Sequence, residues 1–466
     1  MRTLIANGRI ITAFEDKNAD VLIEDGRIQA IGTDLSVGED TEIHDASGCL
    51  LTPGGVDVHT HLDSDIGVAK SVDTFATGGR AAAFGGTTTV VDFCNQTKGS
   101  SLLKCLDDWH RRAACATVDV GAHMVMMEFD DQARAEMKTL MTREGVTSFK
   151  LFTAYPGALM VDDGTLIKVM QVAGELGGQV SVHCENGHII QNLVEQAVAA
   201  GHTAPKYHML TRPPLAEGEA TNRVICIAET IGTPLYIVHV SAKQALASIA
   251  EAKGRGVHVH AETCPQYLFL STDEYEKPGF EGAKAVLSPP LRERDHVEAL
   301  WSGLENGVLD VVATDHCPFT FEDVYGIKFS KQLGAGTFHK IPGGGPGIEE
   351  RMTVMFGGMR DRGFSLNRFV ETTATAPAKL FGLYPRKGTI AVGSDADIVV
   401  IDPDRKWTIN AAAGHGRADY SLFEGHPATG KISKVFLRGQ LIVDGDRWLG
   451  TDGGGEYLPR TASGFI

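Results

Sequence analysis

Two histidines separated by one residue are the first candidates for chemistry in this chain. His59 and His61 end a short apolar run that begins at Gly55. Alternate residues of a β-strand project from the same face, so both imidazoles could reach one metal ion. Neutral imidazole is a common metal ligand, but such histidines also occur in cores and on surfaces. The pair by itself leaves a metal site and a structural role open.

Further ligand-type side chains occur at the ends of later apolar runs, or within them. They are Lys150, His183, His239 and Asp315. Each alone has an ordinary explanation, such as a hydrogen-bonded core histidine, a loop cap or a lysine whose stem reaches solvent. In a barrel of parallel strands, however, the carboxyl ends of the strands meet at one rim, where the active site lies. Chance would have to place these groups on five different strands, so a shared site is the better explanation.

The ligand types indicate divalent metal ions and a bridge between them. Four imidazoles and one carboxylate suit Zn²⁺ or a similar ion. An ammonium group cannot bridge two cations, because like charges repel. A buried Lys150 with a lowered pKa could react as the free amine with CO₂. The resulting carbamate has two oxygens, one for each ion, and we hypothesise that Lys150 is carboxylated in this way.

Short apolar runs alternate with helical patterns between residues 53 and 384. Eight runs are predicted strands: 56–58, 87–93, 118–127, 147–152, 179–183, 235–240, 257–261 and 310–313. Apolar residues with helical spacing lie between them, at 101–114, 164–176, 187–200, 218–231 and 241–253. Eight alternating units predict an α/β fold, a TIM-type (β/α)8 barrel with long loops. A doubly wound open sheet is the alternative, but no G-x-G-x-x-G follows a strand and opens a helix to support it.

The two ends of the chain have a different pattern from the middle. Asn7-Gly8 and Asp25-Gly26 interrupt alternating residues and predict β-hairpins. Similar patterns return at 393–401 and 435–445. We therefore predict a small β-sandwich domain built from both termini, residues 1–52 and 385–466, with a C-terminal tail. The barrel domain occupies residues 53–384.

Composition limits the class of protein and its partners. Of 466 residues, 43% are hydrophobic and 22% charged, as in soluble globular proteins. The net charge of -16 argues against nucleic-acid or anionic-membrane binding, which requires basic patches. No apolar run approaches the roughly 20 residues of a membrane span, and the N-terminus lacks the apolar region of a signal peptide. Eight scattered cysteines without a C-x-x-C pair indicate reduced thiols, so we expect a cytoplasmic protein.

A series of motifs resembles those of the dihydropyrimidinase and hydantoinase family of cyclic amidohydrolases, in order and over nearly the whole chain. The motifs are Val58–Asp63, Gly85–Thr88, Lys150–Tyr155, His183–Asn186, Glu262–Leu268, Ser288–Arg292, Thr314–Phe319 and Pro346–Arg351. The resemblance implies a binuclear zinc site with carboxylated Lys150 as its bridge. The implied protein ligands are His59, His61, His183, His239 and Asp315.

The resemblance also implies the reaction, which is the hydrolytic opening of a cyclic diamide to an N-carbamoyl amino acid. The substrate would be a 5,6-dihydropyrimidine or a 5-substituted hydantoin. A hydroxide held between the ions would attack the ring carbonyl, and Asp315 would carry its proton to the leaving nitrogen. Tyr155 would donate to the developing oxyanion. Backbone groups of Ser288 and Gly343 would orient the substrate, although this chain has glycine where the family usually has asparagine, which loosens the loop.

Other activities and roles remain open at this point. Allantoinases share the bimetal site, but the sequence around Tyr155 favours the first activity. Non-catalytic dihydropyrimidinase-like interaction proteins lack most of the ligands, all of which this chain retains. The loop at 62–70 would form part of the pocket, but its residues do not select a substituent. The resemblance implies a homotetramer. Four further residues near the motifs are assigned structural or wall positions: His258, His260, His316 and Cys317.

Overall fold

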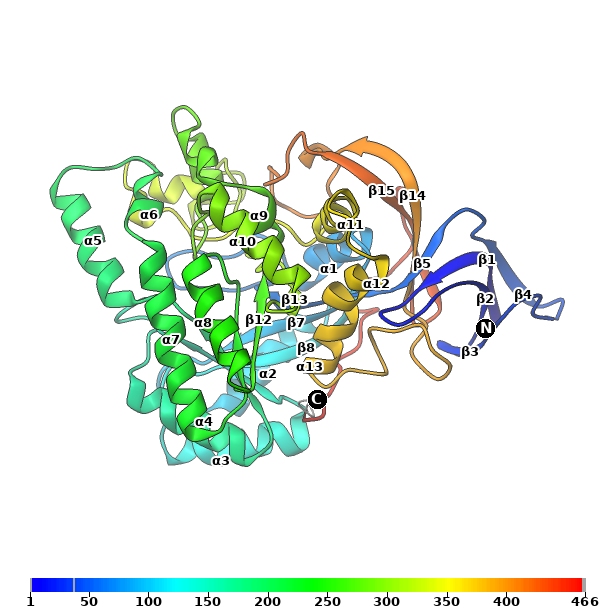
Figure 1. Ribbon diagram of the computed structural model, residues 1–466, viewed down its shortest axis with the longest axis horizontal. Helices are drawn as coiled ribbons and strands as arrows, with labels where there is room; N and C mark the ends of the chain where they lie inside the picture. Colours follow the sequence, from blue (N-terminus) through cyan, green and yellow to red (C-terminus); the bar gives the residue numbers. More distant parts are fainter. Residues whose placement is uncertain (1, 37, 463–466) are drawn as a thin grey trace.

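A parallel eight-stranded sheet forms the centre of the protein (Figure 1). The computed structural model describes residues 2–36 and 38–462. All neighbouring strands of this sheet run parallel and follow the order of the chain. Its strands are β6 (Gly55–Thr60), β7 (Thr87–Asn95), β8 (Asp119–Val125), β9 (Ser148–Phe152), β10 (Gln179–His183), β11 (Leu235–Ile237), β12 (Val259–Thr263) and β13 (Val311–Val312). Each contains part of one predicted strand, so the TIM-type fold is confirmed.

Helices lie between and after the strands, and side-chain caps fix where several of them begin. Ser101, Asp130 and Asp162 each accept a hydrogen bond from a backbone N–H of the first turn that follows. No helix among the described residues is long and apolar enough to cross a membrane. The helices are α1 (Phe75–Phe84), α2 (Leu102–Ala113), α3 (Asp131–Thr139), α4 (Asp163–Glu175), α5 (Gly187–Ala199), α6 (Tyr207–Leu210), α7 (Pro214–Ile231), α8 (Lys243–Gly254), α9 (Pro265–Phe269), α10 (Arg294–Glu305), α11 (Arg351–Asp361), α12 (Leu366–Val370) and α13 (Ala376–Leu380).

A buried arginine joins the first and last strands of the barrel. Arg351 is fully buried, and its guanidinium donates to the carbonyls of Val56 on β6 and Val312 on β13, at 3.2 and 3.0 Å. A single parallel bridge also pairs Thr60 with His316, beyond the end of β13. Burial of a charged group is costly unless it is hydrogen-bonded, and these carbonyls supply the acceptors. The arginine therefore holds together the edge where short strand β13 offers few ladder bonds.

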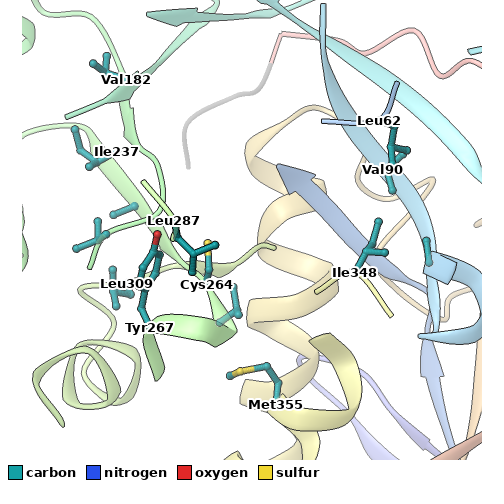
Figure 2. Close-up of a cluster of buried hydrophobic side chains, with 14 of the residues drawn as sticks. Leu62, Val90, Val182, Ile237, Cys264, Tyr267, Leu287, Leu309, Ile348 and Met355 are labelled. Carbon is teal, nitrogen blue, oxygen red and sulfur yellow. The ribbon is translucent and has the colours of Figure 1, made fainter. Parts of the chain in front are cut away.

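The hydrophobic core fills the space between the barrel strands and the helices. Figure 2 shows part of it, with Val182 from β10, Ile237 from β11, Tyr267 from α9 and Met355 from α11. All four side chains are almost completely buried. The barrel strands are buried over almost their whole length, although β6 and β10 alternate apolar with polar residues. Their buried polar residues include the candidate ligands His59 and His183.

Strands from the two ends of the chain form a second, mixed sheet (Figure 1). β14 pairs antiparallel with β5, which joins the N-terminal and C-terminal segments. Lys387 is buried and links this sheet to the barrel. It donates to Asp119, at the start of β8, and to Asp397, directly before β14, at 2.6 and 2.8 Å. The strands are β1 (Arg2–Ile11), β2 (Asp16–Glu24), β3 (Arg27–Gly32), β4 (Thr41–Asp45), β5 (Leu50–Pro53), β14 (Ile398–Thr408), β15 (Pro427–Leu437), β16 (Gln440–Asp444) and β17 (Arg447–Trp448).

One of the two predicted hairpin turns is wrong. Asp25 and Gly26 form the expected turn between β2 and β3, both with positive φ. Asn7-Gly8, in contrast, lies inside the continuous strand β1, where the register with β2 shifts between Ile5 and Gly8. Asn7 has a φ of 62°, so the dipeptide makes a β-bulge instead of reversing the chain. Positive φ angles occur both in the β2–β3 turn and in the β-bulge of β1. Only the strand pairing distinguishes the two structures.

Candidate metal centre and active site

The paired histidines and the predicted aspartate meet at the end of β6. Nε2 of His59 and Nε2 of His61 each lie 3.1 Å from Oδ1 of Asp315. Among the described residues these three form a group whose ligand atoms all lie within 4.8 Å of one another. His59 is 1% exposed, so the group opens to solvent mainly on the side of His61 and Asp315. A His-His-carboxylate set of this compactness suits a divalent transition metal.

His239 and Asp315 were predicted at strand ends, and both lie beyond them. β11 ends at Ile237 and β13 at Val312, before the predicted limits. The φ angles of His239 and Asp315 are 39° and 53°, in the left-handed region that residues with side chains seldom adopt. Both residues therefore turn out of the strand direction at the rim. Such strain is concentrated at functional sites, where the surrounding structure maintains it.

Asp315 is held in this conformation by hydrogen bonds from its neighbours to the barrel. Thr314 donates through its backbone N–H and its hydroxyl to the Asp57 carboxylate, at 3.2 and 2.6 Å. His316 lies 3.2 Å from the buried Asp73 through Nε2, and its Nδ1 accepts a hydrogen bond from the backbone N–H of Gly347. The residues on both sides of Asp315 are thus fixed by buried carboxylates. The His316 ring bonds to Asp73 and to the Gly347 backbone, and its assignment to the wall of the site stays a prediction.

His183 and His239 make a second group beside the first. Their rings are 4.5 Å apart, and the ring of His239 is 5.3 Å from that of His59. His183 Nε2 lies 2.7 Å from Oε2 of the buried Glu185. Nδ1 of His239 and Oε1 of Glu185 are both buried, and neither has a hydrogen-bond partner. Buried polar atoms are almost always satisfied in proteins, so these atoms are consistent with a ligand that the protein atoms alone do not provide.

Lys150 lies inside β9, fully enclosed between aromatic rings. Its Nζ is 5.0 Å from the centre of the Phe93 ring and 5.1 Å from that of Phe152. Burial lowers the pKa of Lys150 to about 8, although the charges of Glu262 and Asp315 oppose the shift. Roughly one tenth of the side chain is therefore the free amine at pH 7, far more than for a lysine with the ordinary pKa of about 10.4. This is the protonation state that reacts with CO₂.

The electrostatics of the cluster favour exchange of a proton for a metal ion. Burial lowers the pKa of His59, but the negative charges of Glu262 and Asp315 outweigh it and raise that pKa to about 9. Burial raises the pKa of Asp315, yet the nearby His59 and His61 bring it well below its usual range. The carboxylates thus attract a positive charge to this position. A divalent cation satisfies the same demand once the imidazole has lost its proton.

The structure adds Glu262, which the sequence analysis did not assign to the site. Glu262 Oε1 accepts a hydrogen bond from Nδ1 of His59, and Oε2 accepts one of 2.8 Å from the hydroxyl of Tyr236. The backbone N–H of His239 also donates to Oε1, at 3.2 Å. A carboxylate on the remote nitrogen of a ligating histidine fixes its tautomer and orientation. Glu262 begins the motif Glu262–Leu268 named above. Its contact with His59, however, becomes visible only in the folded barrel.

The predicted substrate-binding residues lie beside the second histidine group. The Tyr155 ring is 5.4 Å from that of His183, and Tyr155 has a φ of 66°. Burial raises the pKa of the Tyr155 hydroxyl, and a side-chain hydrogen bond with Ser288 opposes the shift. The hydroxyl is therefore protonated and available as a donor. A β-carbon added to Gly343 would lie 3.0 Å from Ser288 Oγ, so these two residues are adjacent as well.

His258 and His260 lie apart from the candidate metal ligands, in agreement with their structural assignment. His258 is exposed before β12 begins. Nδ1 of His260 lies 3.4 Å from the carboxylate of Asp310, near the other end of the barrel. Burial raises the pKa of the Cys317 thiol, and Cys317 packs with Ala69 in a small apolar cluster. None of these side chains belongs to the compact His-His-Asp group.

Comparison with known proteins identifies the family. Residues 50–442 match the model of the amidohydrolase family. The chain is 47% identical to D-hydantoinase from Geobacillus stearothermophilus, with 100% of this chain and 98% of the relative covered. It is 41% identical to D-phenylhydantoinase from Escherichia coli O1:K1 / APEC, covering 99% of this chain and 98% of the relative.

Solved structures agree with the sequence relatives. The crystal structure of dihydropyrimidinase from Brevibacillus agri superimposes with a TM-score of 0.97 at 47% identity, covering 99% of both chains. L-Hydantoinase (dihydropyrimidinase) from Arthrobacter aurescens gives a TM-score of 0.89 at 30% identity, covering 98% of this chain and 99% of that one. The family implies a divalent metal centre, for which the structure supplies the His-His-Asp group. The chain belongs to the amidohydrolase family, as a cyclic amidohydrolase of the dihydropyrimidinase and D-hydantoinase type.

Proposed function

We propose that the protein opens the ring of a cyclic diamide, a 5,6-dihydropyrimidine or a 5-substituted hydantoin, to give the N-carbamoyl amino acid. The observation that carries this proposal is that Tyr155 lies beside His183, a proposed metal ligand, and bonds through its hydroxyl to Ser288, which is adjacent to Gly343. A metal site supplies the hydrolytic chemistry, while a hydroxyl donor and main-chain groups next to it suit a planar ring of amide groups. Relatives named D-hydantoinase at 44–47% identity over nearly the whole chain support the same substrate class.

The proposed cofactor is a pair of divalent ions, with Zn²⁺ as the native metal. The donor set fits, because imidazole and carboxylate are the ligands that zinc prefers and His239 Nδ1 has no partner within the protein. Lys150, between two rings and with a lowered pKa, is the proposed N6-carboxylated bridge. The proposed protein ligands are His59, His61, His183, His239 and Asp315.

The side chains then have separate roles in the reaction. When bound, the ions lower the pKa of water and polarise the carbonyl that is attacked. Asp315 accepts the proton of the attacking water and delivers it to the ring nitrogen that leaves. Tyr155 donates its hydroxyl to the carbonyl oxygen as negative charge develops there. The main chain at Ser288 and Gly343 holds the ring so that the reacting carbonyl faces these groups.

The test is a substrate panel combined with a metal count. We expect about two ions per chain and turnover of dihydrouracil or 5-substituted hydantoins. Turnover of allantoin in preference to both would support an allantoinase instead. A folded, metal-free protein inert toward the whole panel would support the non-catalytic interaction protein and overturn the proposal.

We further propose that the D enantiomer of a 5-substituted hydantoin is preferred. The relatives named D-hydantoinase are 44–47% identical to this chain, whereas the L-hydantoinase of Arthrobacter aurescens is 30% identical. Chiral chromatography of the N-carbamoyl product, formed from substrates that do not racemise under the assay conditions, measures the preference. Faster formation of the L product would contradict it.

The assembly and location proposed are a homotetramer in the cytoplasm. The tetramer is proposed from the family resemblance. All eight cysteines are free, in agreement with a reducing compartment. Light scattering coupled to size-exclusion chromatography gives the assembly directly, and a monomer at the enzyme's working concentration would contradict the tetramer.

A further inference from the structure

A lysine outside the metal centre is completely buried and bonded to three main-chain carbonyls. Lys331 has no exposed surface, and its Nζ donates to the carbonyl oxygens of Val286, Pro342 and Gly344, at 2.8, 2.7 and 2.6 Å. Three acceptors match the three donors of an ammonium group. Burial lowers the pKa of Lys331 to about 7, so the charged form here depends on these acceptors. Burial of a charged lysine is costly unless it is hydrogen-bonded. The chain segments that Lys331 bonds to therefore indicate its role.

The three carbonyls belong to the two segments that carry the proposed substrate-binding groups. Val286 lies two residues before Ser288, whereas Pro342 and Gly344 flank Gly343 on both sides. The Gly344 backbone N–H also donates to the Val286 carbonyl, at 3.1 Å. The ammonium therefore lies directly behind both segments and fixes their separation.

The second segment has little stiffness of its own. It contains four glycines among residues 343–347, and Gly344 has a φ of 148°. Glycine has the largest backbone conformational freedom of all residues. Hydrogen bonds from outside this segment are therefore needed to keep its carbonyl groups in one orientation. A β-carbon at Gly344 would lie 2.5 Å from the Cys317 carbonyl oxygen, so glycine is required there. Bonds from Lys331 on both sides of Gly343 compensate for this freedom.

The lysine is itself well anchored. Its backbone N–H donates to the Thr320 carbonyl at 2.8 Å, and its Nζ lies 5.6 Å from the centre of the Phe319 ring. Phe319 is fully buried and follows the Asp315 segment closely in the chain. The backbone of Lys331 is thus bonded to Thr320, and its Nζ lies between the two proposed substrate-binding segments.

We propose that Lys331 is a positioning residue that holds the main chain at Ser288 and Gly343 in the arrangement that binds the substrate ring. The proposal rests on the substrate-binding role proposed above for these two residues. Lys331 acts on the reaction through backbone geometry, because the three hydrogen bonds of its Nζ all go to main-chain carbonyls and none of them to a proposed metal ligand. Its loss should therefore weaken substrate binding more than the chemical step.

The test is Lys331→Met in the full-length, metal-loaded enzyme. Methionine has a similar length and no donor, so the three carbonyls lose their common partner. We expect KM to rise about 10-fold, as when uniform binding energy is lost, with kcat changed less than about 3-fold. Metal content should equal that of the wild type. The matched control is Lys340→Met, which changes an exposed lysine of the neighbouring segment and should leave KM and kcat unchanged.

The possible results separate this proposal from the proposed function. An unchanged KM in folded Lys331→Met would overturn the positioning role while leaving the function intact. Equal losses in kcat and metal content would likewise overturn it, because they indicate a general structural role. If Lys331→Met does not fold, Lys331→Gln, which is shorter and has two donors instead of three, should show a smaller rise in KM in the same direction, and an unchanged KM there overturns the proposal. A wild type inert toward every cyclic diamide would overturn both.

Discussion

Replacement of Glu262 by glutamine is expected to weaken metal binding while leaving every proposed metal ligand in place. The Glu262 carboxylate is completely buried and accepts hydrogen bonds from His59 Nδ1, the Tyr236 hydroxyl and the His239 backbone. Two of these donors belong to proposed ligands. Glutamine has the same shape but no charge, so it still occupies the space and loses the attraction that orients His59 toward the metal.

The size of the effect follows from the kind of bond that is changed. A hydrogen bond to a charged group contributes roughly 1.5–3 kcal/mol, and one between neutral groups roughly 0.5–1.5 kcal/mol. The difference of about 1–2 kcal/mol corresponds to a decrease in affinity of about 5- to 30-fold. Changes in outer-shell partners of metal-bound histidines typically cost about 10- to 100-fold. The two ranges overlap at about 10- to 30-fold, which is the expected loss.

Competition with a chelator of known affinity measures this loss. The metal-loaded Glu262→Gln variant should release its ions at a lower chelator concentration than the wild type. Tyr236→Phe removes one donor to the same carboxylate and leaves the contact with His59, so its effect should be smaller. Glu298→Gln changes an exposed carboxylate that pairs with Arg362 and is the matched control.

Wild-type metal affinity in a folded Glu262→Gln variant would refute the reasoning. Thermal unfolding of the metal-free proteins supplies the necessary check on folding. A variant that loses metal only because it unfolds would also lose stability without metal. Metal release by a variant that is still fully folded without metal at the assay temperature is the result that assigns orientation of His59 to Glu262.

Three further changes test other parts of the site and fold. Lys150→Ala should lose metal and activity, with partial recovery in a short-chain carboxylate that replaces the carbamate, and full activity without it would refute the bridge. Tyr155→Phe should reduce kcat about 100-fold or more, as loss of an oxyanion donor does, with metal content unchanged. Burial and the charge of Glu349 raise the pKa of Glu350 from its ordinary value of 4.5 to about 6. The folded chain therefore binds more protons than the unfolded chain in that range, and stability should fall by up to about 2 kcal/mol as the pH rises through it. Denaturant unfolding of Glu350→Gln, which does not titrate there, should lack this decrease.

Strand periodicity was sufficient to predict the barrel and the positions of several candidate ligands at its rim. His59 lies on β6 and His61 directly after it, and His183 is the last residue of β10. In a parallel sheet the carboxyl ends of all strands lie at one edge. Residues at these ends therefore lie close together, independently of the conformation of the loops. The burial of Lys150 also followed from the sequence, because its neighbours in the strand are apolar. These predictions depend only on local patterns and on the rules of parallel sheets.

Backbone conformation at the rim could not be predicted in the same way. The runs containing His239 and leading to Asp315 are apolar and resemble strands, yet both residues adopt positive φ after shorter strands. For Asp315 the cause is tertiary, because the bonds from Thr314 to Asp57 and from His316 to Asp73 hold the segment from both sides. The partners lie 257 and 243 residues away in the chain. Asn7-Gly8 failed for a similar reason, since only its pairing with β2 makes it a bulge.

The residues that sequence reasoning missed are those that hold other residues in place. Glu262 contacts His59 across 203 positions, and Lys331 reaches Val286 across 45. Neither residue has a sequence spacing that indicates its role. A residue that positions another one can lie on any neighbouring strand or loop, at any distance along the chain. The two act on different things: Glu262 bonds to the histidines, whereas Lys331 bonds to the main chain that faces the substrate. Metal affinity and KM should therefore respond to separate side chains, and this separation allows the chemistry of the centre to be retained while the substrate segment changes.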